Sequence, residues 1–257
     1  MLDFLKKHND VIKARVTTQR RLEHELLQSG IEDPALVTKL AIAGPMTRTD
    51  FKYIRRKMRT TLQELNIYKA ILEDGKLIHG AFANCTALTS VIIPNWTSEI
   101  GKTAFSNCKS LTSFTIPKSV TKIGELAFWC CYNLKSIIIP DAVTELGFRT
   151  FNNCYSLTSV TLPSLLVKIG GSAFGNCGSL ASIRIPDSVT EIGNGAFAHC
   201  TSLDTVRIPK TVTKIGDWAF ENCTCPIILD EGNPEYLIHD GKIMTNVAYQ
   251  IRFGEKL

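Results

Sequence analysis

The sequence of 257 residues has no apolar run of the roughly 18 residues that a membrane-spanning helix needs. The opening stretch, MLDFLKKHND, contains basic side chains but no apolar run after them, so it lacks the pattern of a secretory signal peptide. Charge is moderate: 29 Lys and Arg against 24 Asp and Glu give a net charge of +5. A dense basic face, the usual mark of nucleic-acid binding, is not expected. We expect no nucleic-acid partner and no membrane span.

Motifs for catalysis and metal binding are also missing from the sequence. The five histidines are scattered, and no two of them have the spacing of an H-x-x-x-H or H-E-x-x-H pair. Neither a phosphate-binding Walker A motif nor the G-x-S-x-G motif of hydrolases occurs. The cysteines never form the C-x-x-C pairs of zinc sites. We therefore expect a protein that is not an enzyme, with no catalytic residues, no cofactor and no metal.

The sequence does contain a strict period of 23 residues. Seven of the nine cysteines follow it: Cys85, Cys108, Cys131, Cys154, Cys177, Cys200 and Cys223. Phenylalanine recurs at the same step at Phe82, Phe105, Phe128, Phe151, Phe174, Phe197 and Phe220. Leucine, proline and glycine columns run alongside, from Leu88, Pro94 and Gly101 onward. A fixed period between 20 and 30 residues predicts a solenoid whose coils stack on similar coils.

One copy of the repeat shows how a coil is built. LTSFTIP has apolar residues at Leu111, Phe114 and Ile116, which is the L-x-x-L-x-L pattern of a leucine-rich repeat. Alternation predicts a strand with Thr115 facing water. The apolar side chains of the next segment, SVTKIG, are expected to point into the core, and we expect Gly124 to form a corner. AFSNC supplies the opposite wall, and stacking of these apolar layers provides each coil with a core.

The two ends of the chain deviate from the regular repeat. VTKLAI and LQELNI are two further strands of the same pattern, and residues 50–58 between them predict an amphipathic helix with Thr49 as its N-cap. Residues 17–30 predict another helix that ends at Gly30. These helices would cap the N-terminal end of the solenoid. YLIHDGKIM predicts a hairpin around Asp240 and Gly241 that covers the last coil.

The repeat AFxNCxxLTSVxIPxSVTxIG resembles the BspA-type leucine-rich repeats, and the resemblance extends over about residues 20–245. We predict an α/β repeat solenoid: a leucine-rich-repeat right-handed superhelix of 23-residue coils, with a helical N-terminal cap and a C-terminal β-hairpin. The expected divisions are 1–35 for the cap, 36–76 for divergent repeats, 77–229 for regular repeats and 230–257 for the hairpin. The resemblance implies a surface or secreted protein of mucosal bacteria that acts in adhesion, and it implies no catalytic motif.

Two further columns have structural interpretations. We expect the cysteine column to consist of buried free thiols that pack like small apolar groups, with disulfide, zinc or redox roles as the alternative. Cys130 and Cys225 lie outside this column, and their role stays open. A second column alternates in sign, and we expect opposite charges to neighbour one another there as surface ion pairs. Its members are Glu99, Lys122, Glu145, Lys168, Glu191 and Lys214.

Candidate binding residues are those where a coil departs from its own consensus. Trp129, Tyr132 and Tyr155 could form an exposed aromatic patch, with local packing over a bend as the alternative. Arg184 and Arg207 form a charged end on the strand face, with ordinary solvated strand residues as the alternative. The expected function is a non-enzymatic binding module for a protein or glycan ligand, host-derived or not. A structural spacer with no ligand of its own is the second hypothesis.

Overall fold

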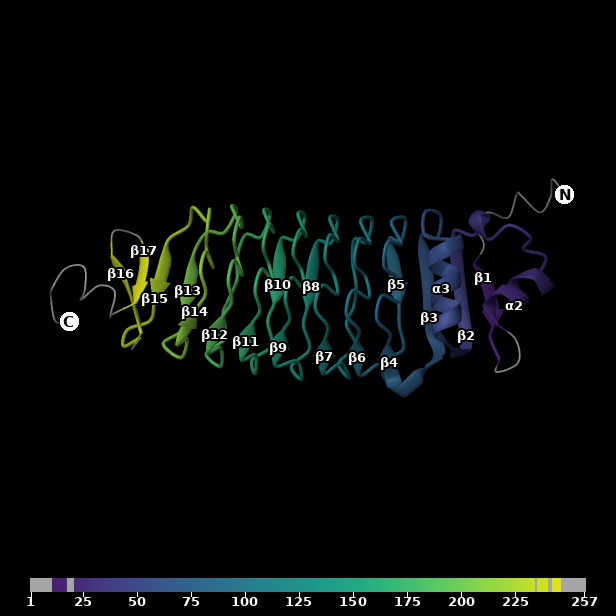
Figure 1. Ribbon diagram of the computed structural model, residues 1–257, viewed down its shortest axis with the longest axis horizontal. Helices are drawn as coiled ribbons and strands as arrows, with labels where there is room; N and C mark the ends of the chain where they lie inside the picture. Colours follow the sequence, from purple (N-terminus) through teal and green to yellow (C-terminus); the bar gives the residue numbers. More distant parts are fainter. Residues whose placement is uncertain (1–10, 18–20, 234, 240–241, 246–257) are drawn as a thin grey trace.

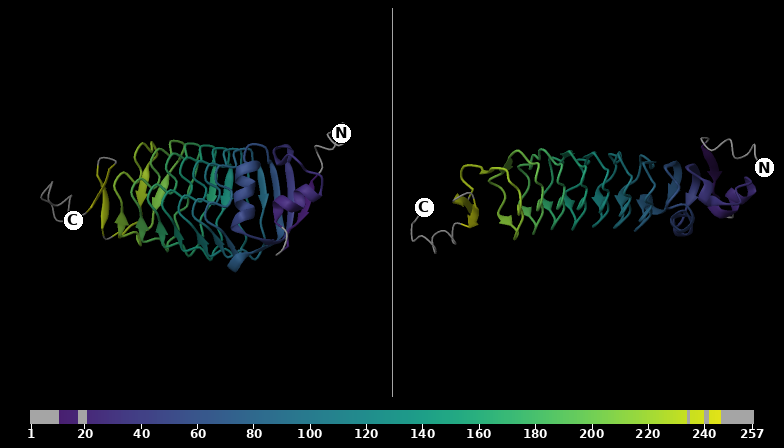
Figure 2. Two further views of the ribbon diagram at one scale, coloured as in Figure 1. Left: turned by 45° about the vertical axis from the view of Figure 1, so that its right-hand side comes forward. Right: turned by 90° about the horizontal axis from the view of Figure 1, so that it is seen from above.

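The computed structural model describes residues 11–17, 21–233, 235–239 and 242–245. The chain winds into a rod of stacked coils that progress in sequence order, so residues 11–17 and 242–245 lie at opposite ends of the rod (Figure 1). The views in Figure 2 show the same uninterrupted stack from two other sides. The predicted solenoid of 23-residue coils is confirmed.

The first wall of the solenoid is the predicted strand column. Its strands pair in parallel, with a separation of 23 residues in the regular coils, as in Ser136 with Ser159, and of 21 residues at the last pair, Val206 with Ile227. The strands are β5 (Ser90–Ile92), β8 (Ser136–Ile138), β10 (Ser159–Thr161), β13 (Val206–Ile208) and β15 (Ile227–Leu229). The strand expected at 114–116 is not formed, and the coil after β10 is joined to it only by an isolated bridge between Ser159 and Ser182. Between these segments the coils stack as extended chain.

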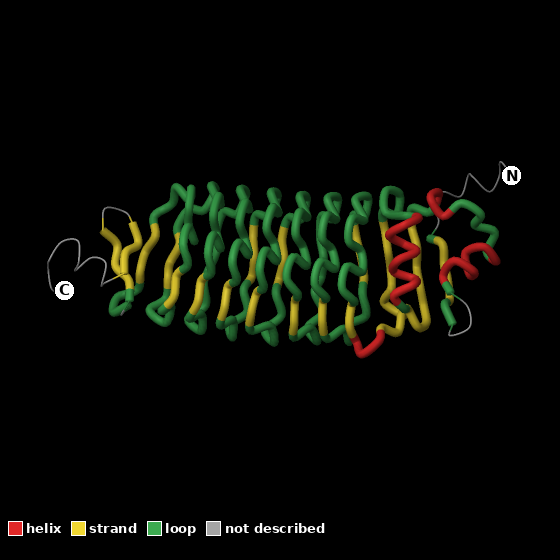
Figure 3. The backbone as a smooth tube through the Cα atoms, viewed as in Figure 1, coloured by secondary structure: helices red, strands yellow, loops and turns green. Residues whose placement is uncertain are grey.

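A second column of very short strands follows the prolines and was not predicted. It is built from a [K/E]-[I/L] pair, whose Ile or Leu is buried in all but the last coil while the charged residue faces outward. The strands form a three-stranded and a four-stranded parallel sheet along one edge of the rod (Figure 3). They are β4 (Lys76–Leu77), β6 (Glu99–Ile100), β7 (Lys122–Ile123), β9 (Glu145–Leu146), β11 (Lys168–Ile169), β12 (Glu191–Ile192) and β14 (Lys214–Ile215).

The third wall consists of turns rather than strands, and it has two columns of residues with positive φ. One is the asparagine column, in which Asn107 has φ +59° and its amide donates a hydrogen bond to Asn84 Oδ1 at 3.0 Å. Asparagine tolerates this left-handed conformation better than most residues, which explains its recurrence. The other column runs from Gly80 through Arg149 to Trp218, four residues earlier in each coil. We call this wall the turn wall.

The glycines expected at the corners lie where neighbouring coils approach closely. The φ of Gly124 is not positive, but a Cβ at this position would lie 2.4 Å from Lys102 N in the preceding coil. Gly193 has the same constraint, with its Cβ position 2.6 Å from Gly171 N. A side chain at these points would hold neighbouring coils apart, so glycine is needed to keep the stacking distance.

The core contains the phenylalanine column as a continuous stack of rings. Phe128, Phe151 and Phe174 are fully buried, with centroids 5.2 Å and 5.5 Å apart and ring planes within 8° of parallel. The cysteine column borders this stack. Cys154 Sγ donates a hydrogen bond to Phe128 O in the preceding coil at 3.3 Å, and the same bond recurs from Cys108 to Cys223. The thiols therefore act as small apolar residues that also satisfy a buried carbonyl.

The N-terminal end of the rod contains strands as well as helices. β1 (Ile12–Arg15), β2 (Lys39–Met46), β3 (Glu64–Leu72) and β5 form one parallel sheet. The segment expected to be a helical cap thus includes β1, which extends the sheet past β2, together with α2 (Leu22–Gln28). Two 3-10 turns, Pro34–Leu36 and Glu73–Gly75, connect these elements.

The second helix, α3 (Arg48–Lys57), packs on the turn wall, and Phe51 begins the ring stack by an edge contact with Phe82. Its N-cap is Thr47 and not the expected Thr49. The Asp50 carboxylate accepts hydrogen bonds from both the backbone N–H and the hydroxyl of Thr47, which completes a capping box. A capping box needs the acid three residues after the cap, and only Thr47 has that spacing.

The C-terminal end carries the predicted hairpin, in which β16 (Tyr236–His239) pairs antiparallel with β17 (Lys242–Thr245). Its expected turn at Asp240 and Gly241 lies outside the described residues. Ile215 N–H of the last regular coil donates a hydrogen bond to Tyr236 Oη at 2.7 Å. This contact attaches the hairpin to the end of the second strand column.

Candidate functional site

An open groove of about 760 Å³ lies on the turn wall, toward the C-terminal half of the rod. It extends from the coil of Phe148 to the coil of Trp218, which are three coils apart. At a coil spacing of about 4.8 Å, this places the two ends about 14 Å apart. One side of the groove borders the second strand column, and the other borders the asparagine column.

The groove exists because two consecutive coils have small side chains where their neighbours have large ones. The position of Phe148 is occupied by Gly171 and Asn194 in the next two coils, and the position of Arg149 is occupied by Ser172 and Gly195. The Trp129 position behaves in the same way. The next coil holds the buried Asn152 at this position, and the two coils after it hold Gly175 and Ala198. A depression two coils wide is thus encoded by side-chain size alone.

Aromatic rings stand at both ends of this depression. Phe148 remains 44% exposed, and the Arg149 guanidinium lies 4.8 Å from its ring centroid. Trp218 is 70% exposed at the opposite end, and Trp129 lines the groove beside Phe148. Aromatic residues are enriched at the centres of binding interfaces, so exposed rings at both ends of one groove make it a candidate site. We call Trp129, Phe148 and Trp218 the aromatic walls.

The backbone of the floor is hydrogen-bonded between coils. Ser172 N–H donates to Asn194 O at 2.8 Å, and Asn176 N–H donates to Ala198 O at 2.7 Å. Asn152 lies beneath the floor, where its buried amide donates to Gly175 O at 3.0 Å. A Cβ at Gly175 would lie 2.6 Å from that amide nitrogen, so glycine is required there. The floor is therefore rigid and offers a ligand few backbone groups.

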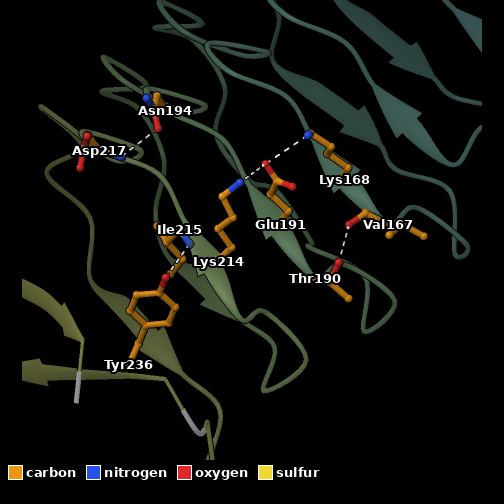
Figure 4. Close-up of polar contacts among 9 residues, drawn as sticks. All are labelled: Val167, Lys168, Thr190, Glu191, Asn194, Lys214, Ile215, Asp217 and Tyr236. Carbon is orange, nitrogen blue, oxygen red and sulfur yellow. Dashed lines mark hydrogen bonds and ion pairs between the residues drawn. The ribbon is translucent and has the colours of Figure 1, made fainter. Parts of the chain in front are cut away.

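Side-chain polar groups remain available on the floor. Within the described residues, neither the Asn176 amide nor the Ser172 hydroxyl has a hydrogen-bond partner, and both are partly exposed. Asn194 Oδ1 accepts a hydrogen bond from Asp217 N–H at 3.1 Å, which leaves its amide nitrogen for a ligand (Figure 4). His199 continues the asparagine column at this point, with its Nδ1 3.3 Å from the Asn222 amide. The floor thus presents uncharged amides, a hydroxyl and an imidazole.

The strand edge of the groove carries two lysines that share one glutamate. Glu191 Oε1 lies 3.1 Å from the ammonium groups of both Lys168 and Lys214, as Figure 4 shows. The hydrogen bond from Lys214, together with that from Lys168, holds the pKa of Glu191 below its ordinary value. The expected alternation of charge is confirmed here and also between Lys122 and Glu99, at 3.1 Å. Part of this column, expected to be structural only, therefore also borders the groove.

The aromatic residues predicted from the sequence occupy two places. Tyr132 and Tyr155 stack with ring centroids 4.9 Å apart, and Lys109 Nζ lies 5.3 Å from the Tyr132 centroid. A hydrogen bond with the Cys130 side chain raises the pKa of the Tyr132 hydroxyl. Neither tyrosine lines the groove, whereas Trp129 does. The structure thus brings the two tyrosines together and assigns Trp129 to the groove.

The two predicted arginines lie on the strand wall, away from the groove lining. Arg207 makes a bidentate ion pair with Asp230, with distances of 2.5 Å and 2.7 Å, so its guanidinium already has a partner. Arg184 is exposed in the adjacent coil. The Asp230 partner was not foreseen, because Asp230 follows β15 and lies one coil beyond the last clear copy of the repeat.

The cysteines have the properties of buried structural thiols. Burial raises the pKa of Cys85 to about 12 and that of Cys223 to about 11. All nine cysteines are free thiols. In the part of the chain that the structure describes, no three His, Cys, Asp or Glu residues come together in a way that could hold a metal ion. The same residues include no helix long and apolar enough to cross a membrane.

Phe148 and Trp218 are the functional candidates that the sequence interpretation missed. Their signal is present when the coils are aligned at the 23-residue period, at two adjacent positions of the repeat. At the first position Phe148 is followed by two coils with small residues, and at the second position two coils with small residues precede Trp218. Searching each position for unusually small residues as well as unusually large ones would have found the groove. In a sequence, such a depression is indicated by coils with small residues between coils with large ones.

Three solved structures illustrate what the chain is similar to. A T. pallidum leucine-rich repeat protein is 29% identical, with a TM-score of 0.55, over 60% of this chain and 72% of that one. A leucine-rich cell surface protein from Faecalibacterium prausnitzii is 26% identical, with a TM-score of 0.44, over 73% of this chain and 55% of that one. A leucine-rich repeat protein from Bacteroides ovatus is 20% identical, with a TM-score of 0.37, over 76% and 72%. No curated protein matches the sequence.

The family profile that matches is described as BspA type leucine rich repeat region. It occurs in six copies, over residues 76–203 and 167–229, and so covers more than half of the chain. These matched residues carry both strand columns and the whole groove. Solenoids of this kind characteristically serve as interaction modules, because their stacked coils provide long continuous surfaces. The chain belongs to the BspA-type leucine-rich-repeat family, and it is a repeat protein of the protein-interaction class.

Proposed function

We propose that this protein is a non-enzymatic adhesion module, displayed on the bacterial surface or secreted, that binds a macromolecular partner in the groove between Phe148 and Trp218. The observation that carries the proposal is the pair of exposed aromatic walls at the two ends of a rigid, two-coil depression. Aromatic side chains dominate the energetics of most binding sites because they bury a large area at low entropic cost. The family membership and the cell-surface description of the Faecalibacterium relative support the location.

Tyr132, Tyr155, Arg184 and Arg207 stay candidate contact residues outside the groove. The tyrosine pair forms a separate aromatic surface, and Lys109 already covers part of it. Arg207 would have to leave Asp230 to serve a partner, whereas Arg184 is exposed. We therefore rank the groove above both of these surfaces.

The second candidate function is a spacer that holds another part of a surface protein away from the cell. The charge column favours it, because Glu99 with Lys122 and Glu191 with its two lysines give an edge of paired charges. A surface built only for separation would be evenly polar in this way. The aromatic walls are the feature that a spacer does not explain.

The test is a binding screen of the purified chain against arrays of extracellular matrix proteins and of glycans. The ligand that binds is then measured with three variants: Trp129→Ala with Trp218→Ala, Tyr132→Ala with Tyr155→Ala, and Arg184→Ala. Loss of binding in the first alone supports the groove. Unchanged binding in the first, with the fold intact by circular dichroism, refutes the groove as the site. A chain that binds nothing on either array favours the spacer.

A further inference from the structure

We infer that the groove binds a neutral carbohydrate chain that runs along the rod; this rests on the proposed function and names the chemistry of its ligand. The first argument is the spacing of polar groups on the floor. The asparagine column presents Asn153, Asn176 and His199 at successive coils, and so at steps of about 4.8 Å. The residue repeat of an extended pyranose polymer is close to this step. Such a polymer meets an equivalent polar group at each sugar.

Peptide chains do not match this spacing. An extended peptide advances about 3.3 Å per residue and a polyproline helix about 3.1 Å, so successive residues do not fall on successive coils, and only about every third residue returns to register, at every second coil. A peptide that adds to a sheet edge also needs unpaired backbone groups. On the groove floor, Ser172 N–H and Asn176 N–H are already bonded to the next coil. The floor therefore offers a peptide main chain few partners.

The polar groups of the floor suit hydroxyl groups. The Asn176 amide can both donate and accept hydrogen bonds, and the Ser172 hydroxyl can do the same. Sugar hydroxyls have this same dual capacity, so each contact can be made in either direction. Both side chains lack a partner among the described residues, and both lie on the rigid part of the floor.

The aromatic walls suit the apolar faces of sugar rings. Trp218 and Phe148 expose their rings at opposite ends of the groove, about 14 Å apart by coil count. This is room for about two to three sugar residues between them. The C–H bonds on one face of a pyranose pack on the negative face of an aromatic ring, in the manner of other edge contacts to rings.

The charges around the groove favour an uncharged ligand. Arg149, Lys168 and Lys214 are nearly balanced by Glu191 and Glu221 among the side chains that line the groove, so the groove offers an anionic ligand little net attraction. Glu221 and Asp217 flank Trp218, and their carboxylates repel an anionic chain at that end. Arg149 at the other end lies against the Phe148 ring. An acidic polysaccharide or a nucleic acid would therefore meet repulsion in part of the groove.

The experiment measures binding of defined hexasaccharides by isothermal titration calorimetry and by quenching of tryptophan fluorescence. The neutral probes are cellohexaose, maltohexaose, mannohexaose and chitohexaose; a heparin hexasaccharide and a decaproline peptide are the comparison ligands. We expect at least one neutral probe to bind with a Kd of about 1 mM or tighter. Trp218→Ala and Phe148→Ala should each weaken it about tenfold or more. Trp96→Ala is the matched control, because Trp96 is also exposed but lies outside the groove.

The outcomes separate this inference from the proposed function. If no neutral probe binds, or if Trp218→Ala leaves the binding of such a probe unchanged, the carbohydrate inference is overturned. If decaproline or the heparin fragment binds instead and depends on Trp218, the inference is also overturned, but the groove stands as the binding site. The proposed function itself is refuted only if the ligand found in the array screen binds the groove variants as tightly as it binds the parent protein.

Discussion

Replacement of Phe151 by alanine tests whether the coils are held together by the ring stack. Phe151 is fully buried, and its centroid lies 5.2 Å from that of Phe128 and 5.5 Å from that of Phe174. Truncation of a buried phenylalanine costs about 3–5 kcal/mol, through lost transfer free energy and the cavity left behind. The two ring contacts, at about 0.5–1.5 kcal/mol each, place the expected loss in the upper part of that range. The assay is guanidinium denaturation followed by circular dichroism.

Phe220→Ala is the matched control for this experiment. Phe220 is only partly buried, and it has a single ring neighbour, Phe197, at 5.4 Å. Its truncation should therefore cost about half as much as that of Phe151, because one contact and part of the buried area are missing. A loss below about 1 kcal/mol for Phe151→Ala, or equal losses for the two variants, would refute the stacking account.

Three smaller predictions concern the glycines, the thiols and the charge column. Gly193→Ala should cost about 1–3 kcal/mol in denaturation, because its Cβ would lie 2.6 Å from backbone, whereas Gly178→Ala should be nearly neutral, since its Cβ would meet only a hydroxyl at 3.7 Å. In thiol counting with a chromogenic disulfide at pH 8, the partly exposed Cys225 and Cys223 should react first and the buried cysteines only after denaturation; rapid labelling of all nine would contradict the fold position of the column. The lowered pKa of Glu191 means that its ion pairs stabilise the fold above the unfolded-state pKa of about 4.3 and that this contribution disappears as pH falls through the lower folded-state pKa. Glu191→Gln should therefore reduce stability at pH 7 by at most about 1 kcal/mol and not at pH 2, and an equal loss at both pH values would refute the ion pairs.

The repeated columns were predictable because each copy of the repeat places the same residue type at the same position of the coil. Seven phenylalanines at one step leave no alternative to a stacked core, and the structure buries six of them fully. The second strand column escaped prediction because its strands are only two residues long, too short to show an alternating pattern. The glycine column was predicted to form corners, but the close approach between coils that requires glycine there shows only in three dimensions.

The ends of the rod and the groove were less predictable. β1 has the short sequence IKAR, which carries no leucine-rich pattern, and only its pairing with β2 defines it as a strand. The groove depends on which bulky residues lie beside which small ones in three dimensions. Trp129 was selected for its size, but its neighbours Tyr132 and Tyr155 turned out to lie on a different surface. Sequence distance within a coil does not show which side chains share a surface once the coil bends.

The most direct test of the groove as the binding site is to fill it without touching its walls. Ala198 lies on the floor, at the repeat position that Trp129 occupies three coils earlier, so its backbone accepts a tryptophan. Ala83 occupies the same position in a coil outside the groove and provides the control. Surface plasmon resonance on the ligand from the array screen should show that Ala198→Trp weakens binding about tenfold or more, while Ala83→Trp binds like the parent. Equal binding by the two variants would contradict the account.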